Sequence, residues 1–295
     1  MTTDRPAPAA GSDVFHLSGL DTARLPVLVA VPHAGCVYPP DMRANLRVAP
    51  RVLERLEDRH ADALAADVEA AGCVLLTAQV ARAYIDLNRS PQEIDPSMVR
   101  DAPRSAFAQP SVKVRGGLGL VPRRLADHGE LWHGPWQRSD IARRVTTVHE
   151  PYHRTMSQTL AALKSRFGVA LLIDLHSMPP IVSDGTKPIP RLVVGDRYGR
   201  AAAARICDLA VRTLALEGQQ VALNHPYAGG YILDRHGRPE HGIHALQIEI
   251  DRSLYLDESL RECGPGLAAM RATIVTLAQV LADDLCNRGY AVAAE

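Results

Sequence analysis

The stretch ALLIDLHS, residues 170–177, decides the fold because it joins an apolar run to polar side chains at its end. Gly168 precedes the run, and the turn SMPP at residues 177–180 follows it. A short apolar run between such breaks is typical of a strand buried on both faces, the kind of strand found in parallel sheets. The stretch therefore predicts a buried strand that delivers Asp174, His176 and Ser177.

Elsewhere in the chain, further apolar runs predict strands at residues 27–31, 74–78, 83–87, 191–194, 220–223 and 245–251. Residue patterns predict helices at 52–71, at 135–167 with a break near Pro151, at 198–216 and at 266–287. Strands alternating with helices indicate an α/β fold, with a mostly parallel sheet covered on both faces. We expect a flexible N-terminus over residues 1–20 and a single catalytic domain over residues 21–295. Within it, the Pro- and Gly-rich residues 90–130 are typical of a lid or a binding segment.

The composition excludes several classes of protein. The 295 residues carry 33 Lys and Arg against 33 Asp and Glu, so we expect no nucleic-acid partner. No uncharged apolar run approaches the roughly 18 residues that a membrane span needs, and the N-terminus lacks the apolar core of a signal peptide. The five cysteines form no C-x-x-C pair, which favours a reducing cytoplasm over a disulfide framework.

Polar side chains gather where the predicted strands end, and this is where ligands bind in α/β sheets. The residues concerned are His33, Asp86, Asn88, Arg89, Asp174, His176, Ser177, Glu249 and the loop from Asn224 to Gly230. We expect these strand ends to converge. Two imidazoles and one carboxylate would leave an open coordination position for water on a zinc ion, so the pattern favours a metal-dependent hydrolase.

His33 and His176 are the natural imidazole pair, although a single histidine of this kind can also be a loop or core residue. The carboxylate ligand stays open: Asp58 lies on a predicted helix, where a solvated face shared with Asp62 is the simpler interpretation. Glu249 stands between two isoleucines, where an ionised carboxylate needs a partner or a polar cavity. It is either a general base or half of a salt bridge.

The pair Asn88 and Arg89 has two interpretations. The Arg89 guanidinium either binds a substrate carboxylate or is simply a surface arginine.

Other motifs that would indicate a different enzyme class are incomplete or absent. The sequence GLGLVP at residues 117–122 lacks the third glycine of a dinucleotide fingerprint. No G-x-S-x-G motif exists, so a serine hydrolase is not expected.

Eight short motifs occur in order along the chain: VPHAG (31–35), YP (38–39), DLNR (86–89), GLG (117–119), PYH (151–153), DLHSMP (174–179), NHPYAGG (224–230) and QIE (247–249). Together, over about residues 27–260, they resemble the N-formylglutamate amidohydrolase family. The resemblance implies a three-layer α/β/α fold with a mostly parallel mixed sheet, phosphorylase/hydrolase-like and similar to zinc carboxypeptidases. It also implies one catalytic zinc and the cleavage of N-formyl-L-glutamate to L-glutamate and formate in histidine degradation.

The resemblance assigns roles to particular residues. His33, Asp58 and His176 would bind the metal, and Glu249 would be the catalytic base. The H-x-x-E spacing of zinc carboxypeptidases is absent, because Cys36 stands three residues after His33; Asp62 and Asp86 therefore remain substitutes for Asp58. The substrate would contact Asn88, Arg89, Asn224, Tyr227, Gly229 and Gly230, while Asp174 and Ser177 would support the metal ligands.

Several alternatives remain open. An aspartoacylase-like or succinylglutamate-type deacylase, or a small carboxypeptidase, would use the same zinc on another substrate. A degenerate carboxylate-binding protein would keep the scaffold without activity. Another divalent metal in place of Zn²⁺ and a homo-oligomer also fit the sequence. The partner expected in each case is a small N-acyl amino acid, with neither nucleic acid nor a membrane.

Overall fold

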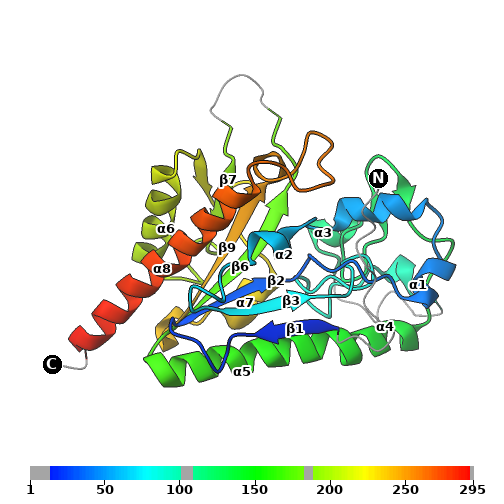
Figure 1. Ribbon diagram of the computed structural model, residues 1–295. Helices are drawn as coiled ribbons and strands as arrows, with labels where there is room; N and C mark the ends of the chain where they lie inside the picture. Colours follow the sequence, from blue (N-terminus) through cyan, green and yellow to red (C-terminus); the bar gives the residue numbers. More distant parts are fainter. Residues whose placement is uncertain (1–13, 101–108, 183–188, 293–295) are drawn as a thin grey trace. The chain divides into compact units, whose positions relative to one another are not determined.

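The computed structural model describes residues 14–100, 109–182 and 189–292. Its main feature is a seven-stranded sheet of order β1-β3-β2-β6-β9-β7-β8 (Figure 1). The strands are β1 (Phe15–Ser18), β2 (Val27–Val31), β3 (Val74–Ala78), β6 (Ala170–Met178), β7 (Leu192–Gly195), β8 (Val221–Leu223) and β9 (Ile243–Asp251). β2 is parallel to β3 and β6, and β6 is parallel to β9, whereas β7 is antiparallel to β9. The predicted α/β fold with a mixed, mostly parallel sheet is confirmed.

Apolar burial explains the central strands. Every residue of β2 and β6 is buried, and their register pairs Val27 with Leu171 and Ala30 with Asp174. Strands covered on both faces carry continuous aliphatic runs, and both of these runs were visible in the sequence. The exceptions in β6 are Asp174, His176 and Ser177, and all three side chains are buried.

The chain divides into two compact units. One consists of Leu17–Pro32, Asp58–Thr77 and Arg154–Glu295 and holds most of the sheet; the other consists of Met1–His16, His33–Glu57 and Ala78–His153. We call them the sheet unit and the loop unit. Each is assembled from three separate segments, so the chain passes between the units several times. The expectation of a single catalytic domain over residues 21–295 stays a prediction.

Helices flank the sheet in the sheet unit. They are α2 (Ala61–Leu64), α5 (Glu150–Phe167), α6 (Ala204–Leu216), α7 (Tyr231–His236) and α8 (Leu267–Val292), with 3₁₀ turns η5 (Pro239–His241) and η6 (Arg252–Leu254). α8 contacts α2 and α6 (Figure 1). The connection through α2 leads from β2 to its neighbour β3, and the one through α5 leads back across β2 to β6. Since such crossovers are right-handed, α2 and α5 cover opposite faces, as a three-layer arrangement requires.

The loop unit contains short elements. They are α1 (Pro40–Ala44), η1 (Pro50–Leu56), η2 (Pro96–Met98), α3 (Val112–Arg115), the hairpin of β4 (Arg124–Leu125) and β5 (Gly129–Glu130), α4 (Arg138–Arg144) and the π-helical turn η4 (Val145–His149), which leads into α5. The guanidinium of Arg144, fully buried, stacks between the rings of Tyr84 and Trp136. Aromatic stacking of this kind stabilises a buried guanidinium.

Two predicted elements are wrong. Residues 83–87 form no strand; they are buried, but Tyr84 closes a turn on Ala81 and the Asp86 amide donates to the carbonyl of Leu120. The predicted helix at 52–71 is also broken. η1 ends at Leu56 and α2 begins at Ala61, because His60 adopts a left-handed backbone conformation with φ +56°, which an α-helix does not accommodate. Asp58 therefore lies in the interruption between η1 and α2.

Other predictions differ mainly at boundaries. The helix predicted to break near Pro151 is continuous but switches to π geometry just before it, since proline cannot donate a backbone hydrogen bond. The helix predicted at 198–216 begins only at Ala204. The predicted loop at 90–130 holds short elements, and its residues 101–108, like residues 1–13 of the predicted flexible N-terminus, lie outside the described residues. The lid remains a prediction.

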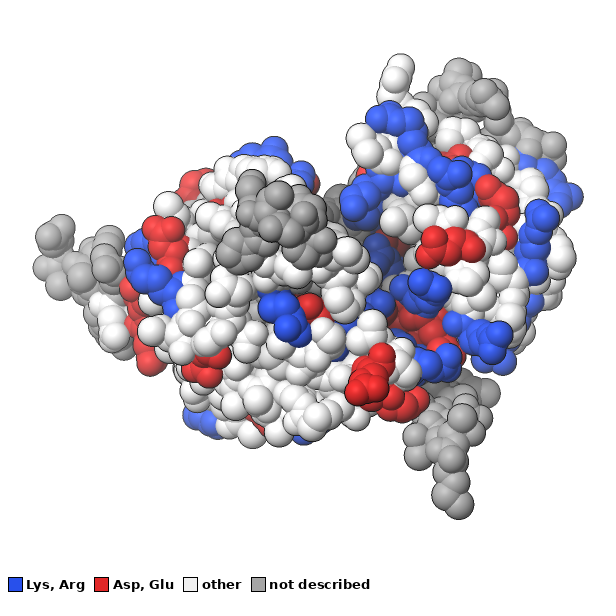
Figure 2. Space-filling model, turned by 90° about the horizontal axis from the view of Figure 1, so that it is seen from above, with Lys and Arg blue, Asp and Glu red and all other residues white. Residues whose placement is uncertain are grey.

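The surface mixes charges of both signs. On the face seen in Figure 2, Lys and Arg side chains alternate with Asp and Glu side chains, in keeping with their equal numbers. Within the described ranges, no helix has both the length and the apolar content to cross a bilayer.

Candidate metal centre

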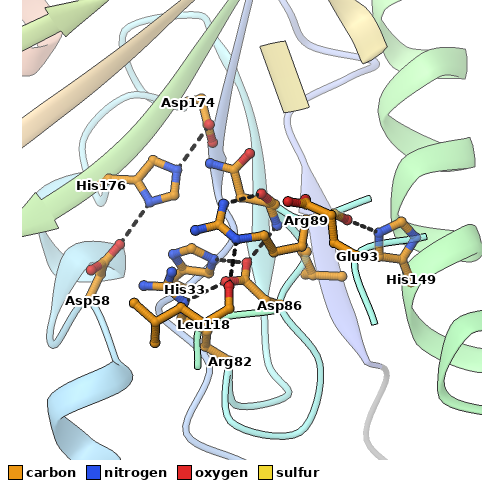
Figure 3. Close-up of polar contacts among 12 residues, drawn as sticks. His33, Asp58, Arg82, Asp86, Arg89, Glu93, Leu118, His149, Asp174 and His176 are labelled. Carbon is orange, nitrogen blue, oxygen red and sulfur yellow. Dashed lines mark hydrogen bonds and ion pairs between the residues drawn. The ribbon is translucent and has the colours of Figure 1, made fainter. Parts of the chain in front are cut away.

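His176 lies between two aspartates of the sheet unit, as Figure 3 shows. Its Nδ1 atom is 3.0 Å from Oδ2 of Asp58, and its Nε2 atom is 3.0 Å from Oδ2 of Asp174, two residues earlier on the same face of β6. Burial alone would lower the pKa of His176, but Asp174, Asp58 and Glu249 raise it well above its usual value. This concentration of negative charge around a buried imidazole suits a cation.

Asp58 owes its position to the interruption between η1 and α2. Its Oδ1 atom accepts hydrogen bonds from Ser177 Oγ at 3.2 Å and from Arg252 Nη2 at 3.3 Å. Asp58 is buried rather than solvated, so the simpler interpretation of a solvated helix face is wrong. Arg252, a contact of Asp58, was not singled out in the sequence; one arginine among many gives no local signal.

His33 belongs to the loop unit, where its Nε2 atom lies 2.8 Å from Oδ1 of Asp86. Asp86 also accepts from Arg82 Nε at 2.8 Å and from the backbone amide of Asn88 at 2.8 Å. Burial alone would raise the pKa of Asp86, but Arg82, His33 and Arg89 lower it well below the usual value. An ionised Asp86 can only accept a hydrogen bond, so a neutral His33 that donates from Nε2 has its ring lone pair on Nδ1.

His33, Asp58 and His176 form the one group of potential metal ligands found among the described residues. All three are buried, and one ligand atom of each lies within 4.8 Å of the others. In the sequence, His33 directly follows Pro32, the last residue of one sheet-unit segment. Asp58 is the first residue of the next sheet-unit segment. Asp62 and Asp86 are outside the group. A neutral imidazole whose second nitrogen is held by a carboxylate is a common metal ligand, and His33 and His176 each have Nε2 on a buried aspartate. The donors thus fit a divalent cation such as Zn²⁺.

Glu249 lies on β9, directly beside His176 in the β6–β9 register. Its Oε1 atom accepts a hydrogen bond of 2.8 Å from Nε2 of Gln247, which lies on the same face of the strand. Glu249 is 7% exposed. The structure therefore places a buried carboxylate next to the imidazole of His176, on the neighbouring parallel strand.

Arg89 is held from several sides within the loop unit. Its Nε donates to the carbonyl of Leu118 at 2.9 Å and its Nη1 to the carbonyl of Asn88 at 2.8 Å (Figure 3). The backbone is held as well, since Nε2 of His149 lies 2.9 Å from the carbonyl oxygen of Arg89, and Nε2 of His153 lies 2.9 Å from that of Leu87. This irregular segment is thus fixed by side chains from the helix that passes along it.

β8 is parallel to β7, and β7 is antiparallel to β9, so the loop after β8 leaves its strand in the direction opposite to that of β6 and β9. The register places Leu223, the last residue of β8, level with Val194 of β7, which pairs with Ile248 of β9. The expectation that the strand ends converge stays a prediction for Asn224. Its Nδ2 donates to Asp196 at 2.7 Å, and its Oδ1 accepts from the Asp196 amide at 3.0 Å. A Cβ on Gly229 would meet Leu233 at 2.5 Å, and φ there is +97°. These contacts give the loop its shape; the substrate contacts of Asn224, Tyr227, Gly229 and Gly230 stay a prediction.

Comparisons with known proteins agree with one another. A family described as N-formylglutamate amidohydrolase matches residues 25–256. The N-formylglutamate deformylases of Pseudomonas aeruginosa and Pseudomonas putida are 34% and 31% identical to this chain, each over 80% of it and 84% of the relative. A crystal structure of N-formylglutamate amidohydrolase from Ralstonia eutropha JMP134 is similar at a TM-score of 0.85 and 33% identity, covering 94% of this chain and 100% of that one. A gene product of Agrobacterium tumefaciens, 17% identical over 93% of this chain and 96% of its own, shares the fold at a TM-score of 0.68.

Proposed function

The chain belongs to the N-formylglutamate amidohydrolase family, and we propose that it hydrolyses N-formyl-L-glutamate to L-glutamate and formate with the help of a divalent metal ion. Its relatives carry the names deformylase and amidohydrolase, which describe the cleavage of one amide bond by water. The proposal that the reaction uses a metal ion rests on the buried group of His33, Asp58 and His176. This reaction would serve histidine degradation.

The metal ligands in this proposal are Nδ1 of His33, Oδ2 of Asp58 and Nδ1 of His176. Asp86 and Asp174 support this choice because each accepts a hydrogen bond from an Nε2 atom, of His33 and of His176 respectively. The Nδ1 lone pairs are then the ones that would bind the ion. Zn²⁺ held there would polarise the formyl carbonyl and lower the pKa of a bound water to about 7.

Glu249 is the proposed general base. It accepts a proton from the water that attacks the formyl carbon, and it returns that proton to the glutamate nitrogen as the C–N bond breaks. Its place beside His176 in the β-ladder and its bond from Gln247 support this role.

Arg89 and Asn88 are the proposed substrate-carboxylate site, with Asn224, Tyr227, Gly229 and Gly230 as further substrate contacts. Arg89 donates from Nε and from Nη1 to backbone carbonyls. The remaining N–H groups of its guanidinium would donate to the substrate carboxylate. Ser177 and Asp174 support the ligands Asp58 and His176. The five cysteines are all free thiols, which supports a reducing cytoplasm as the compartment, and a homo-oligomer remains part of the proposal.

A substrate panel tests the function. Purified protein loaded with Zn²⁺ is given N-formyl-, N-acetyl- and N-succinyl-glutamate, N-formyl- and N-acetyl-aspartate, and a dipeptide with a C-terminal glutamate. We expect formate release from N-formylglutamate at a kcat/KM at least tenfold above that of any other compound. Preference for acetyl or succinyl groups, or for the dipeptide, would replace the proposal by a deacylase or a carboxypeptidase. Zinc binding without turnover of any compound would favour a binding protein.

A further inference from the structure

The carboxylate of Asp58 has two differently engaged oxygens. Oδ2 lies 3.0 Å from Nδ1 of His176, while Oδ1 accepts from Ser177 Oγ at 3.2 Å and from Arg252 Nη2 at 3.3 Å. Arg252 also donates from Nε to Ser177 Oγ at 3.1 Å. A small ring of hydrogen bonds therefore joins Arg252, Ser177 and Oδ1 of Asp58. It lies at the carboxylate oxygen that does not contact His176.

The backbone that carries Arg252 is itself fixed. Arg252 opens the 3₁₀ turn η6 immediately after β9. Asp251, the last residue of that strand, accepts bonds from the amide and hydroxyl of Ser253 at 2.9 and 2.6 Å and from Arg191 Nε at 2.7 Å. These bonds hold the end of β9, the strand that bears Glu249, and so fix the backbone from which Arg252 extends. The side chain of Arg252 is only 12% exposed.

The chain that follows η6 also holds the backbone next to Asp58. Tyr255 Oη donates to the carbonyl of Arg59 at 2.8 Å, and Arg59 Nε donates to the carbonyl of Arg261 at 2.9 Å. Residues 58–60 form no regular helix, and the bond from Tyr255 gives the carbonyl of Arg59 a partner outside the segment. The side chain of Asp58 and the neighbouring residue Arg59 are therefore both held from the same later segment.

We propose that Arg252, together with Ser177, is a positioning residue for metal binding: it holds Oδ1 so that Oδ2 is the atom that Asp58 presents to the ion. This inference rests on the metal site of the proposed function. A carboxylate with one oxygen anchored is a monodentate ligand of defined direction, and it loses less rotational freedom when the metal binds.

Two effects of Arg252 on metal affinity oppose each other. Its positive charge repels a dication, but that charge is already paired with Asp58, whereas removal of the guanidinium takes away one of the two hydrogen bonds that anchor Oδ1. Since loss of an outer partner of a metal ligand typically costs about 10- to 100-fold in affinity, we expect anchoring to win. Arg252→Gln should weaken Zn²⁺ binding by about 10-fold or more, and Ser177→Ala should weaken it by a smaller factor.

The test measures Zn²⁺ affinity of metal-free protein by competition with a chromophoric chelator, at one pH, for the wild type, Arg252→Gln, Ser177→Ala and the double variant. Because both residues hold one oxygen, the loss in the double variant should be smaller than the product of the two single losses. Arg252→Lys should recover part of the affinity through a single hydrogen bond. Arg191→Gln is the matched control, since Arg191 pairs with Asp251, the residue before Arg252; this variant loosens the backbone at the turn but keeps the Arg252 guanidinium, so it should weaken Zn²⁺ binding much less than Arg252→Gln does.

Unchanged or tighter binding by Arg252→Gln would overturn the inference while leaving the metal site in place. Equal losses in Arg252→Gln and Arg191→Gln would also overturn it, since they would point to general loosening of the turn. If Arg252→Gln fails to fold by circular dichroism, Ser177→Ala and Arg252→Lys decide by the same criterion. A wild type that binds no Zn²⁺ would overturn the metal site and this inference together.

Discussion

Glu249 lies directly beside His176 across the parallel β6–β9 ladder, so a proposed base and a proposed metal ligand occupy neighbouring positions on one face of the sheet. Glu249→Gln keeps the shape and the hydrogen-bonding capacity of the side chain but cannot take a proton. We expect kcat for N-formylglutamate to fall by about 10²- to 10⁴-fold with the zinc content unchanged. Full turnover by a zinc-loaded Glu249→Gln protein would exclude Glu249 as the base.

The aspartates behind the imidazoles give a second prediction. Asp174→Asn should weaken Zn²⁺ binding by about 10- to 100-fold, because the amide cannot stabilise the His176 Nε2 proton as a carboxylate does. Asp86→Asn should act in the same way through His33. Asp234→Asn, which disturbs surface pairs with Arg197 and Arg200, is the control. The prediction fails if chelator competition gives the same affinity for Asp174→Asn and Asp234→Asn.

Arg89→Ala should raise KM for N-formylglutamate by about 10- to 100-fold, the value of one charged hydrogen-bonded contact of roughly 1.5–3 kcal/mol. Zinc affinity should change much less, since Arg89 is not among the proposed ligands. Arg55→Ala, at a surface site on a side chain 57% exposed, controls for loss of positive charge. Steady-state kinetics decide the matter, and an unchanged KM in Arg89→Ala would remove its role in substrate binding.

Metal removal should destabilise the fold in proportion to zinc occupancy. A ligand at 100 times its Kd stabilises the native state by about 2.7 kcal/mol, which corresponds to a rise in Tm of several degrees for a domain of this size. Differential scanning fluorimetry with EDTA, followed by added Zn²⁺, measures the change. His176→Ala protein should show no zinc-dependent rise, and a full rise in that variant would argue for metal binding elsewhere.

The core of the sheet unit gives a prediction that is independent of function. Leu172, on β6 in the middle of the sheet, is fully buried, so Leu172→Ala should lower the free energy of unfolding by about 2–5 kcal/mol. Leu216→Ala, at an 87% exposed position at the end of α6, should change it by less than about 0.5 kcal/mol. Urea unfolding of both variants compares the two, and similar midpoints would contradict the burial pattern.

Local sequence was sufficient for much of the sheet. The strands at 27–31 and 74–78 were predicted with their observed bounds, and the strand that carries Asp174 and His176 was predicted as well, although β6 continues to Met178. These strands are buried on both faces, so the apolar run and the strand coincide. His33 and His176 were found for the same reason, because each stands at or just beyond the end of such a run.

Features set by distant contacts were not predictable. The apolar residues 83–87 are buried without forming a strand, since an apolar run reports burial and not backbone geometry. The direction of β8 depends on its partner β7 and leaves no periodicity of its own. Arg252 became visible only through its contact with Asp58, 194 residues earlier in the chain.

That long separation sets a condition on biosynthesis. The ribosome releases Asp58 long before it releases Arg252, Tyr255 and Arg261, the residues that secure the Asp58 segment. Nascent chains that stop short of this point contain both histidines and the aspartate, yet they lack the anchor that orients the carboxylate. At the proposed metal site, capture of zinc in its final geometry would therefore follow the release of the chain through Arg261.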